Sequence, residues 1–178
     1  MEEIDFADVP TDSKDAAEAR VREMIEAFRS EGMFSEEEIE AVDISNIASF
    51  FLTDLGKRTV AAARAGRLLE ERAFTMKLVT KGEPVLVQGI IDCFFTEGEG
   101  ADERTVLLDY KSNYFDLRKP EEEELRLRNT YSGQIALYRR ALEMAGLPPV
   151  KEAYLYLLAV KRLIDMSDTE WGDAGIGE

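Results

Sequence analysis

The sequence predicts an α/β fold with an all-helical N-terminal part, a three-stranded antiparallel meander, a long helix and a last strand. Apolar residues recur at three- and four-residue spacings up to about residue 66, which is typical of helices with one buried face. From residue 68, runs rich in Val, Leu, Ile and Phe alternate with short turn sequences, which indicates strands. The 178 residues are 45% hydrophobic, which suits one domain with a packed core.

The first predicted helix spans residues 14–29, where an apolar stripe at i, i+3, i+4 and i+7 lies opposite an acidic face. Gly32 is expected to end this helix, because glycine readily adopts the left-handed conformation that closes many helices. Ser35, with Glu38 three residues later, forms a capping-box sequence. It predicts the start of a short second helix.

A third helix is expected to begin at Asp43 or Ser45 and to continue to Gly56. Residues 57–65 then have the pattern of a fourth short helix, which Gly66 closes. The first 66 residues should therefore be wholly helical.

Three consecutive strands are predicted at residues 68–79, 85–95 and 105–111. The connection at 81–84 contains Gly and Pro and has the composition of a tight turn, whereas 98–102 is a looser loop of Gly and acidic residues. Connections this short join antiparallel neighbours. The three strands should therefore form a meander.

The long helix is expected to start at Pro120, because proline suits the first helical position and the glutamates after it suit the positive end of the helix dipole. It should continue to about Ala145. Residues 150–160 are apolar on both sides and predict a fourth, fully buried strand. Residues 165–178 are acidic and rich in Gly, and are expected to be a disordered tail apart from a contact that Trp171 could make.

These elements predict a single domain over residues 1–164. Its helical part is residues 1–66 and its α/β core is residues 67–164, and the acidic tail follows as residues 165–178. No internal repeat or low-complexity tract interrupts this organisation.

The charge and the rare residue types exclude several classes of function. Lys and Arg total 22 against 37 Asp and Glu, and a net charge of -15 argues against a broad basic face that grips nucleic acid. One cysteine and no histidine exclude an internal disulfide, cysteine-ligated clusters and the Ser-His-Asp and Cys-His catalytic sets. The N-terminus lacks the features of a signal peptide and no apolar run approaches the roughly 20 residues of a membrane span, so a cytoplasmic protein is expected.

Polar residues interrupt two of the predicted strands. Asp92 lies inside the apolar run 85–95, and the next strand ends in Asp109 and Lys111, which share one face because they are two residues apart. If these strands form a hairpin, the two carboxylates converge beside the ammonium group. Two carboxylates suit Mg2+ or Mn2+, and an ammonium group can orient water or neutralise charge on a phosphate. The pattern is that of a site for phosphodiester hydrolysis.

A purely structural interpretation stays open for these residues. The tripeptide Asp-x-Lys is frequent by chance, and Asp109 could simply form an ion pair with Lys111 or Arg104. Asp92 weighs against that interpretation, because a lone carboxylate in an apolar strand is costly unless it is paired or liganded.

Five stretches of this sequence resemble the PD-(D/E)XK nucleases of the RecB type, and most closely the C-terminal nuclease domain of the AddA subunit of the AddAB helicase–nucleases. Taken together the motifs are specific, and the resemblance extends from about residue 5 to residue 160. It implies a restriction-endonuclease-like core. The matching stretches are residues 71–74, 87–95, 108–111, 131–138 and 154–156.

By this resemblance, Asp92 and Asp109 would ligate a divalent metal ion together with the main-chain carbonyl of Tyr110. Lys111 would be the catalytic lysine. The implied metal is Mg2+, with Mn2+ as a substitute, and no organic cofactor is expected.

Gln134 and Tyr138 would line the same pocket from the long helix, since residues four apart share a helix face. Without the resemblance, Tyr138 is equally well explained as a half-buried core aromatic and Gln134 as a surface residue. Glu71 could face Lys111 or the metal from the first strand, and a solvated strand charge is an equally good explanation.

The sequence departs from the family in two places. Lys111 is followed by Ser112 and Asn113, whereas the family has Thr and Asp, so one carboxylate near the site is an amide. Family members also have a metal-ligating histidine just upstream of the matching region, and this chain contains none. We therefore expect the chain to be a fragment of a larger helicase–nuclease protein.

The resemblance implies an exonuclease that hydrolyses phosphodiester bonds of single DNA strands delivered by a helicase, in the repair and recombination of double-strand breaks. The implied partners are single-stranded DNA, the helicase part of the parent chain and an AddB-type subunit, with no membrane. The alternative is a catalytically weakened module of the same fold that acts in subunit interaction. The missing histidine and Asn113 favour that alternative.

Overall fold

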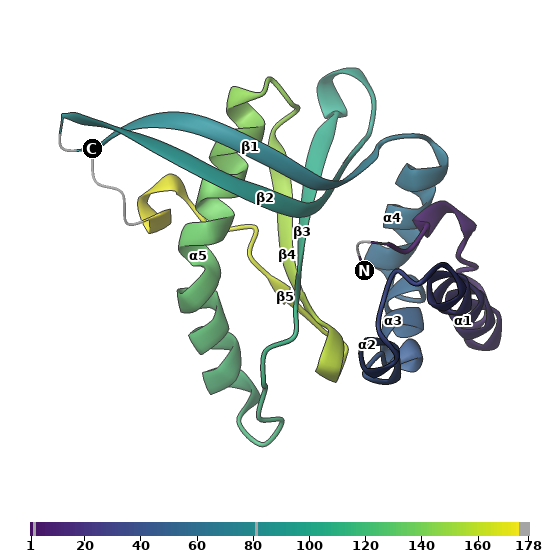
Figure 1. The fold of residues 1–178 in the computed structure, drawn as a ribbon. Coiled ribbons are helices and arrows are strands. Elements are labelled where there is room, and N and C mark those ends of the chain that lie inside the picture. The colour runs from purple at the N-terminus through teal and green to yellow at the C-terminus, as the bar shows by residue number, and fades with distance from the viewer. Residues whose placement is uncertain (2, 81, 175–178) are drawn as a thin grey trace.

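The computed structural model describes residues 1, 3–80 and 82–174, and it has the predicted α/β architecture around one five-stranded mixed sheet (Figure 1). The strands follow each other across the sheet in the order of the sequence. All neighbours are antiparallel except β3 and β4, because the long helix α5 carries the chain back between them. The strands are β1 (Leu68–Thr80), β2 (Glu83–Glu97), β3 (Arg104–Lys111), β4 (Val150–Leu157) and β5 (Arg162–Asp165).

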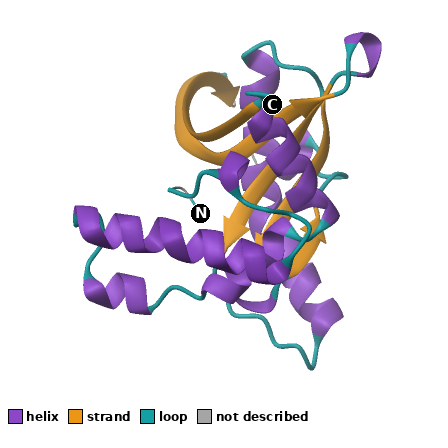
Figure 2. Cartoon of the chain, turned by 90° about the vertical axis from the view of Figure 1, so that its right-hand side faces the viewer, coloured by secondary structure: helices purple, strands orange, loops and turns teal. Residues whose placement is uncertain are grey.

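Helices cover both faces of the sheet. Four helices from the N-terminal part lie on one face, and α5 (Pro120–Met144) lies on the other (Figures 1 and 2). The antiparallel meander, the helix after it and the parallel β4 make up the predicted restriction-endonuclease-like core. The N-terminal helices are α1 (Lys14–Glu31), α2 (Glu36–Glu40), α3 (Ile44–Phe51) and α4 (Asp54–Arg64).

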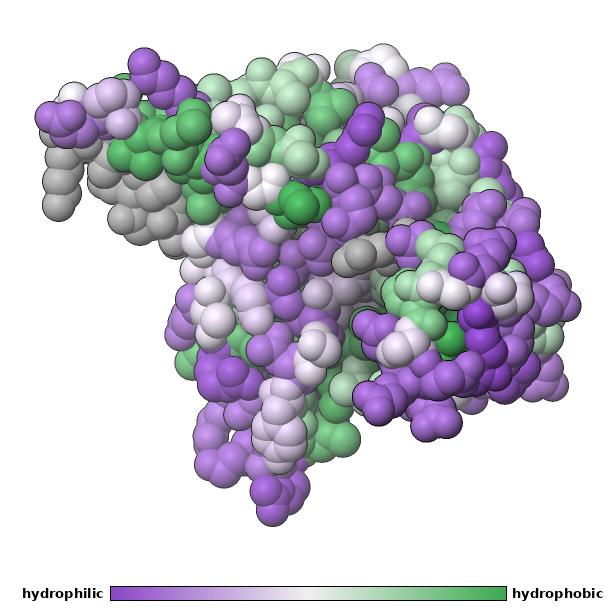
Figure 3. All heavy atoms as spheres, in the orientation of Figure 1, coloured by the Kyte–Doolittle hydropathy of each residue, from purple (hydrophilic) through white to green (hydrophobic). Residues whose placement is uncertain are grey.

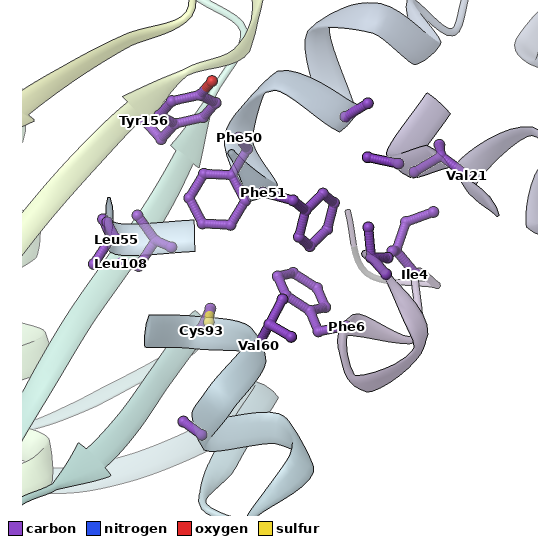
Figure 4. Packing of buried hydrophobic residues seen from close by; sticks show 14 of the residues in the cluster. Ile4, Phe6, Val21, Phe50, Phe51, Leu55, Val60, Cys93, Leu108 and Tyr156 are labelled. Carbon is purple, nitrogen blue, oxygen red and sulfur yellow. The ribbon is translucent and has the colours of Figure 1, made fainter. Parts of the chain in front are cut away.

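The two faces of the sheet belong to two apolar clusters. On the N-terminal side, Phe6, Phe50 and Phe51 pack edge to face and contact the sheet near Cys93 (Figure 4). On the other side, residues such as Leu107 pack against α5. Neighbouring residues of a strand thus enter different clusters, as expected for strands buried on both faces.

The third helix ends earlier than the sequence predicted. Instead of continuing to Gly56, α3 stops at Phe51, and α4 starts after the N-cap Thr53, whose hydroxyl accepts a hydrogen bond from the Gly56 N–H at 2.9 Å. Gly56 lies inside α4, where a Cβ atom would stand 2.1 Å from the Phe50 carbonyl oxygen. The glycine therefore permits close packing of the two helices and does not end either of them.

The chain after residue 157 also differs from the prediction. β4 ends at Leu157, a 3-10 turn follows, and Lys161 takes a positive φ of 54° before β5 pairs antiparallel with β4. From residue 165 the sequence predicted a disordered tail, whereas the structure gives residues 165–174 defined positions. Met166 is 1% exposed, and Trp171 begins the 3-10 helix η4 (Trp171–Ala174). Residues 175–178 of that predicted tail lie outside the described residues.

Strands β1 and β2 continue far beyond the rest of the sheet as a two-stranded arm. β1 pairs with β2 from Leu68–Phe95 to Thr80–Glu83, whereas β3 pairs with β2 only from Cys93 to Glu97. The arm exposes apolar side chains, which form part of the hydrophobic surface in Figure 3. These exposed residues are Val79, Val85, Leu86 and Ile90. None of the described helices combines the length and apolarity that a membrane span requires.

Candidate active site

The candidate site lies where β2 separates from β3. Their ladder ends at the pair Cys93–Leu108, and the next step of this register places Asp92 opposite Asp109. The Tyr110 N–H donates a hydrogen bond to Asp92 Oδ2 at 3.0 Å, so the side chain takes the place of a main-chain acceptor. The hairpin expected from the sequence thus brings the two carboxylates together.

Among the charged side chains of the candidate site, Asp109 is the most deeply buried and has no exposed surface. Its Oδ2 forms an ion pair with the Lys111 ammonium, whereas its Oδ1 has no hydrogen-bond partner among the described residues. Burial, followed by the negative charge of Asp92, raises the pKa of Asp109 to about 6, although Lys111 acts in the opposite direction. The ion pair foreseen in the structural interpretation therefore exists, but it leaves the carboxylate poorly satisfied.

The Lys111 ammonium lies 4.6 Å from the centre of the Tyr131 ring on α5. The Tyr131 hydroxyl donates a hydrogen bond to Asn113 Oδ1 at 2.7 Å. The aromatic ring attracts the cation and so helps to hold its position. Neither Tyr131 nor Asn113 was among the predicted site residues. The signal for Tyr131 was its spacing, since it precedes Gln134 by three residues on the helix.

Gln134 and Tyr138 lie together on α5, where Gln134 Nε2 donates a hydrogen bond to the Tyr138 hydroxyl at 2.6 Å. The Tyr138 ring contacts Phe74 of β1 edge to face, with the ring centres 5.8 Å apart. Burial raises the pKa of Tyr138 to about 12, and the negative charges of Asp109 and Asp92 contribute. The phenol is therefore a neutral group that faces the carboxylates from the helix.

A cleft of about 210 Å³ opens at Asp92 and is lined by Glu70, Glu71 and Tyr110 among others. The register of β1 and β2 passes from Glu70–Cys93 to Arg72–Ile91, which places Glu71 opposite Asp92. Glu71 has a φ of 47°, in the left-handed region that side chains other than glycine rarely adopt. Glu71, Asp92 and Asp109 thus follow one another across three neighbouring strands.

Glu70 adds a titratable group to this cleft. Burial raises the pKa of Glu70 to about 7, with smaller contributions from the charges of nearby acids. Glu70 is therefore only partly ionised near neutral pH, while the cleft brings it together with Glu71 and Asp92.

A buried carboxylate oxygen without a hydrogen-bond partner, such as Asp109 Oδ1, fits a hard divalent cation such as Mg2+. Asp92 is the second carboxylate, and Tyr110 follows Asp109 directly on β3. Among the residues that the structure describes, no group of three or more acidic or thiol side chains is close enough to hold a metal. The donor set thus fits a cation that keeps several water ligands, which is common for Mg2+.

Comparison with known proteins adds independent information. No family model matches the chain. The A subunit of the ATP-dependent helicase/nuclease of Anoxybacillus flavithermus is 35% identical over 154 residues, which are 86% of this chain and 12% of that protein. Proteins of the same name are 39% identical over 77% of the chain in Pelotomaculum thermopropionicum, and 32% identical over 87% of it in Bacillus cereus.

The chain spans about an eighth of the length of these curated relatives. Over about four fifths of its length, this chain is a homologue of one segment of AddA, the A subunit of the ATP-dependent helicase/nucleases.

Proposed function

We propose that this chain is a Mg2+-dependent nuclease domain of the PD-(D/E)XK class that hydrolyses phosphodiester bonds of single-stranded DNA. One observation carries the proposal: Asp109 is fully buried beside a second carboxylate, Lys111 pairs with its Oδ2, and its Oδ1 lacks a hydrogen-bond partner among the described residues. A group in that state is costly to the fold, and a bound cation would relieve the cost. Mn2+ is expected to substitute for Mg2+.

The residues of the chain would divide the work as follows. Asp92 and Asp109, with the Tyr110 main-chain carbonyl, would hold the cation, which when bound supplies Lewis acidity at the phosphate. Lys111 would orient the attacking water and neutralise the charge that develops on the phosphate. The water contributes its hydroxyl to phosphorus and its proton to the departing sugar oxygen.

Gln134 and Tyr138 would position the substrate from α5. They are hydrogen-bonded to each other and lie near the carboxylates, so each can offer a hydrogen-bonding group to a phosphate or a sugar. Because the Tyr138 phenol is neutral at physiological pH, it adds no further negative charge against the DNA backbone.

The names of the relatives, which join a helicase and a nuclease, support a nuclease that acts beside a helicase. Its proposed role is the repair and recombination of double-strand breaks, on single strands delivered by the helicase. The partners would be the helicase part of a parent chain and an AddB-type subunit. The net charge of -15 fits such a role, because a module supplied by a motor does not need its own broad affinity for DNA. Exonucleolytic rather than internal cleavage is part of this proposal.

Two observations favour the alternative, a weakened nuclease fold that acts in subunit interaction. Asn113 is held by Tyr131 where the family has a carboxylate, and fewer than three metal-binding side chains meet among the described residues. The buried charge favours the catalytic interpretation. A site that no longer catalyses a reaction would be expected to lose Asp109, because burying its carboxylate destabilises the fold.

The test is cleavage of end-labelled single-stranded DNA in Mg2+ and separately in Mn2+, with Asp109→Ala and Lys111→Ala beside the unchanged chain. We expect metal-dependent cleavage that both substitutions abolish while circular dichroism stays unchanged. Cleavage that survives in Asp109→Ala would contradict the assignment. Absence of cleavage together with absence of Mn2+ binding in calorimetry would favour the alternative.

A further inference from the structure

A groove of about 710 Å³ lies between the edge strand β1, helix α5 and η4. In Figure 1, η4 lies beside α5 beneath the arm formed by β1 and β2. Three cations and two acids line the groove, so its charge is positive in a chain whose net charge is -15. The cations are Lys77, Arg139 and Arg140, and the acids are Glu143 and Glu170.

The cations of the groove are only weakly neutralised. Arg139 is fixed by two main-chain acceptors, the carbonyls of Ser167 and Val150, each at 2.8 Å. Arg140 pairs with Glu143 at 3.4 Å. Among the residues that the structure describes, neither Lys77 nor Arg139 has a carboxylate within ion-pair distance. The groove thus offers positive charge to a ligand without first breaking a strong pair.

Trp171 provides a flat apolar surface at the same place. It packs against the small apolar cluster of Met76, Leu78 and Ala141, which joins β1 to α5. The indole is nevertheless only partly buried, so the cluster positions it without enclosing it. An aromatic ring held in this way can stack on a nucleobase of any identity.

The groove and the candidate active site share helix α5 and strand β1. Arg139 follows Tyr138 directly, and Ala136, which lines the groove, is two residues beyond Gln134. On the opposite wall, Phe74 contacts Tyr138 from the same strand that contributes Lys77. One helix turn advances only about 5.4 Å, so Arg140 lies less than a turn from Tyr138 along the helix axis, although the two side chains point to different sides of the helix.

We propose that this groove binds single-stranded nucleic acid, with a base stacked on Trp171 and phosphates contacting Lys77 and Arg140. Aromatic platforms beside cationic groups are the usual means by which proteins bind single strands without sequence preference. An acidic peptide would use the cations but would gain little from the indole face. The path from groove to carboxylates rests on the proposed function, whereas the binding itself does not.

The binding test uses the intrinsic fluorescence of Trp171, the one tryptophan in the sequence. A 20-nucleotide oligothymidylate is titrated into the full chain at low salt with EDTA present, which prevents cleavage. We expect saturable quenching with a Kd on the order of 10 to 100 μM. In the double variant Lys77→Ala, Arg140→Ala, the Kd should rise about ten-fold, and the slope of log Kd against log salt should fall by about 1.4.

Lys151→Ala is the matched control, because Lys151 is an exposed lysine on β4 that does not line the groove and has no ion pair among the described residues. Its Kd should stay within two-fold of the unchanged chain. A labelled oligothymidylate followed by anisotropy checks Trp171→Leu, for which we expect about ten-fold weaker binding. Circular dichroism confirms that each variant is folded.

Three results would overturn the proposal: no quenching, an unchanged Kd in the double variant, or equal quenching by polyglutamate, which would assign the groove to an acidic peptide. The proposed function fails separately. Quenching without metal-dependent cleavage would support nucleic-acid binding in the groove and contradict the nuclease assignment. Cleavage without quenching would support the nuclease assignment and contradict binding in the groove.

Discussion

Two charged clusters lie at opposite ends of the short ladder between β2 and β3, and their charges are balanced differently. At one end Arg58 binds Glu97 at 2.7 Å and Glu152 at 2.8 Å, and Arg104 binds the same Glu97 at 2.6 Å. We call these four residues the balanced cluster. Two cations face two anions there, and each side chain keeps some contact with solvent.

At the other end, two carboxylates share one lysine. Asp92 and Asp109 meet beside Lys111, and Asp109 has no exposed surface. We call these three residues the unbalanced cluster. The pKa shifts have opposite directions, because Arg58 holds the pKa of Glu152 below its usual range while burial raises that of Asp109 to about 6.

The comparison distinguishes ion pairs that stabilise the fold from buried charges that the fold alone does not explain. The balanced cluster connects α4 to β2 and β4 through hydrogen bonds of Arg58, and Arg104 of β3 joins it through ion pairs with the same two glutamates. The unbalanced cluster gives Asp109 an ion pair at Oδ2 only and leaves its Oδ1 without a hydrogen bond among the described residues. Burying such a group costs stability, so a ligand that compensates the charge is the simplest reason for its presence.

The largest expected effect is on catalysis in the unbalanced cluster. If the proposed function is correct, Asp109→Asn should lower the cleavage rate by about 1,000-fold or more, because a metal ligand and its charge are lost. The melting temperature of the metal-free protein should change little or rise. Cleavage assays and thermal unfolding in EDTA measure the two quantities, and a large loss of stability would show Asp109 to be structural.

In the balanced cluster the order of effects should be reversed. Arg58→Ala should lower the free energy of unfolding by about 1 to 2 kcal/mol, because Glu97 and Glu152 then share only Arg104, while partial exposure limits the loss. Cleavage at a temperature where the variant is folded should stay unchanged. Denaturant unfolding measures the stability, and Lys57→Ala on the same helix provides a surface control.

The pH dependence of stability should differ in sign between the clusters. Folding favours the neutral form of Asp109, so its contribution in metal-free protein is greatest at low pH and is lost as the pH rises through about 6. Folding favours ionised Glu152, so its contribution is present above its unfolded pKa and is lost as the pH falls.

The contribution of each residue is measured as the free energy of unfolding of the unchanged chain minus that of its variant, at several pH values between 4 and 7. The difference should decrease with pH for Asp109→Asn and increase with pH for Glu152→Gln. Slopes of the same sign for the two variants would contradict the distinction between the clusters.

The smallest expected effect concerns how Lys111 is held. Tyr131→Phe keeps the ring beneath the ammonium and removes only the hydrogen bond to Asn113, so cleavage should fall by no more than about three-fold. Tyr131→Leu removes the ring as well and should cost about ten-fold. Equal activity of the two variants would show that the ring does not position Lys111.

Local patterns in the sequence were sufficient for most of the elements. Pro120, the capping pair Ser35 and Glu38, and the turn around Gly82 have local physical roles, and the structure confirms the elements that they predicted. The misplaced boundary at Gly56 has a non-local cause, because that glycine is needed for contact with the Phe50 carbonyl of another helix. Strand β5 was missed because its four residues are too short to show a period.

The sequence by itself determined the order of helices and strands, the shared face of Asp109 and Lys111, and the excess of negative charge, since each depends on composition or on spacing within one element. Only the tertiary structure decided that Asp92 reaches the Tyr110 N–H, that Tyr131 lies beside Lys111, and that Trp171 joins a groove with Lys77. These contacts join distant parts of the chain. The register of strand pairing and the packing of the helices bring these residues together, and a local sequence pattern encodes neither the register nor the packing.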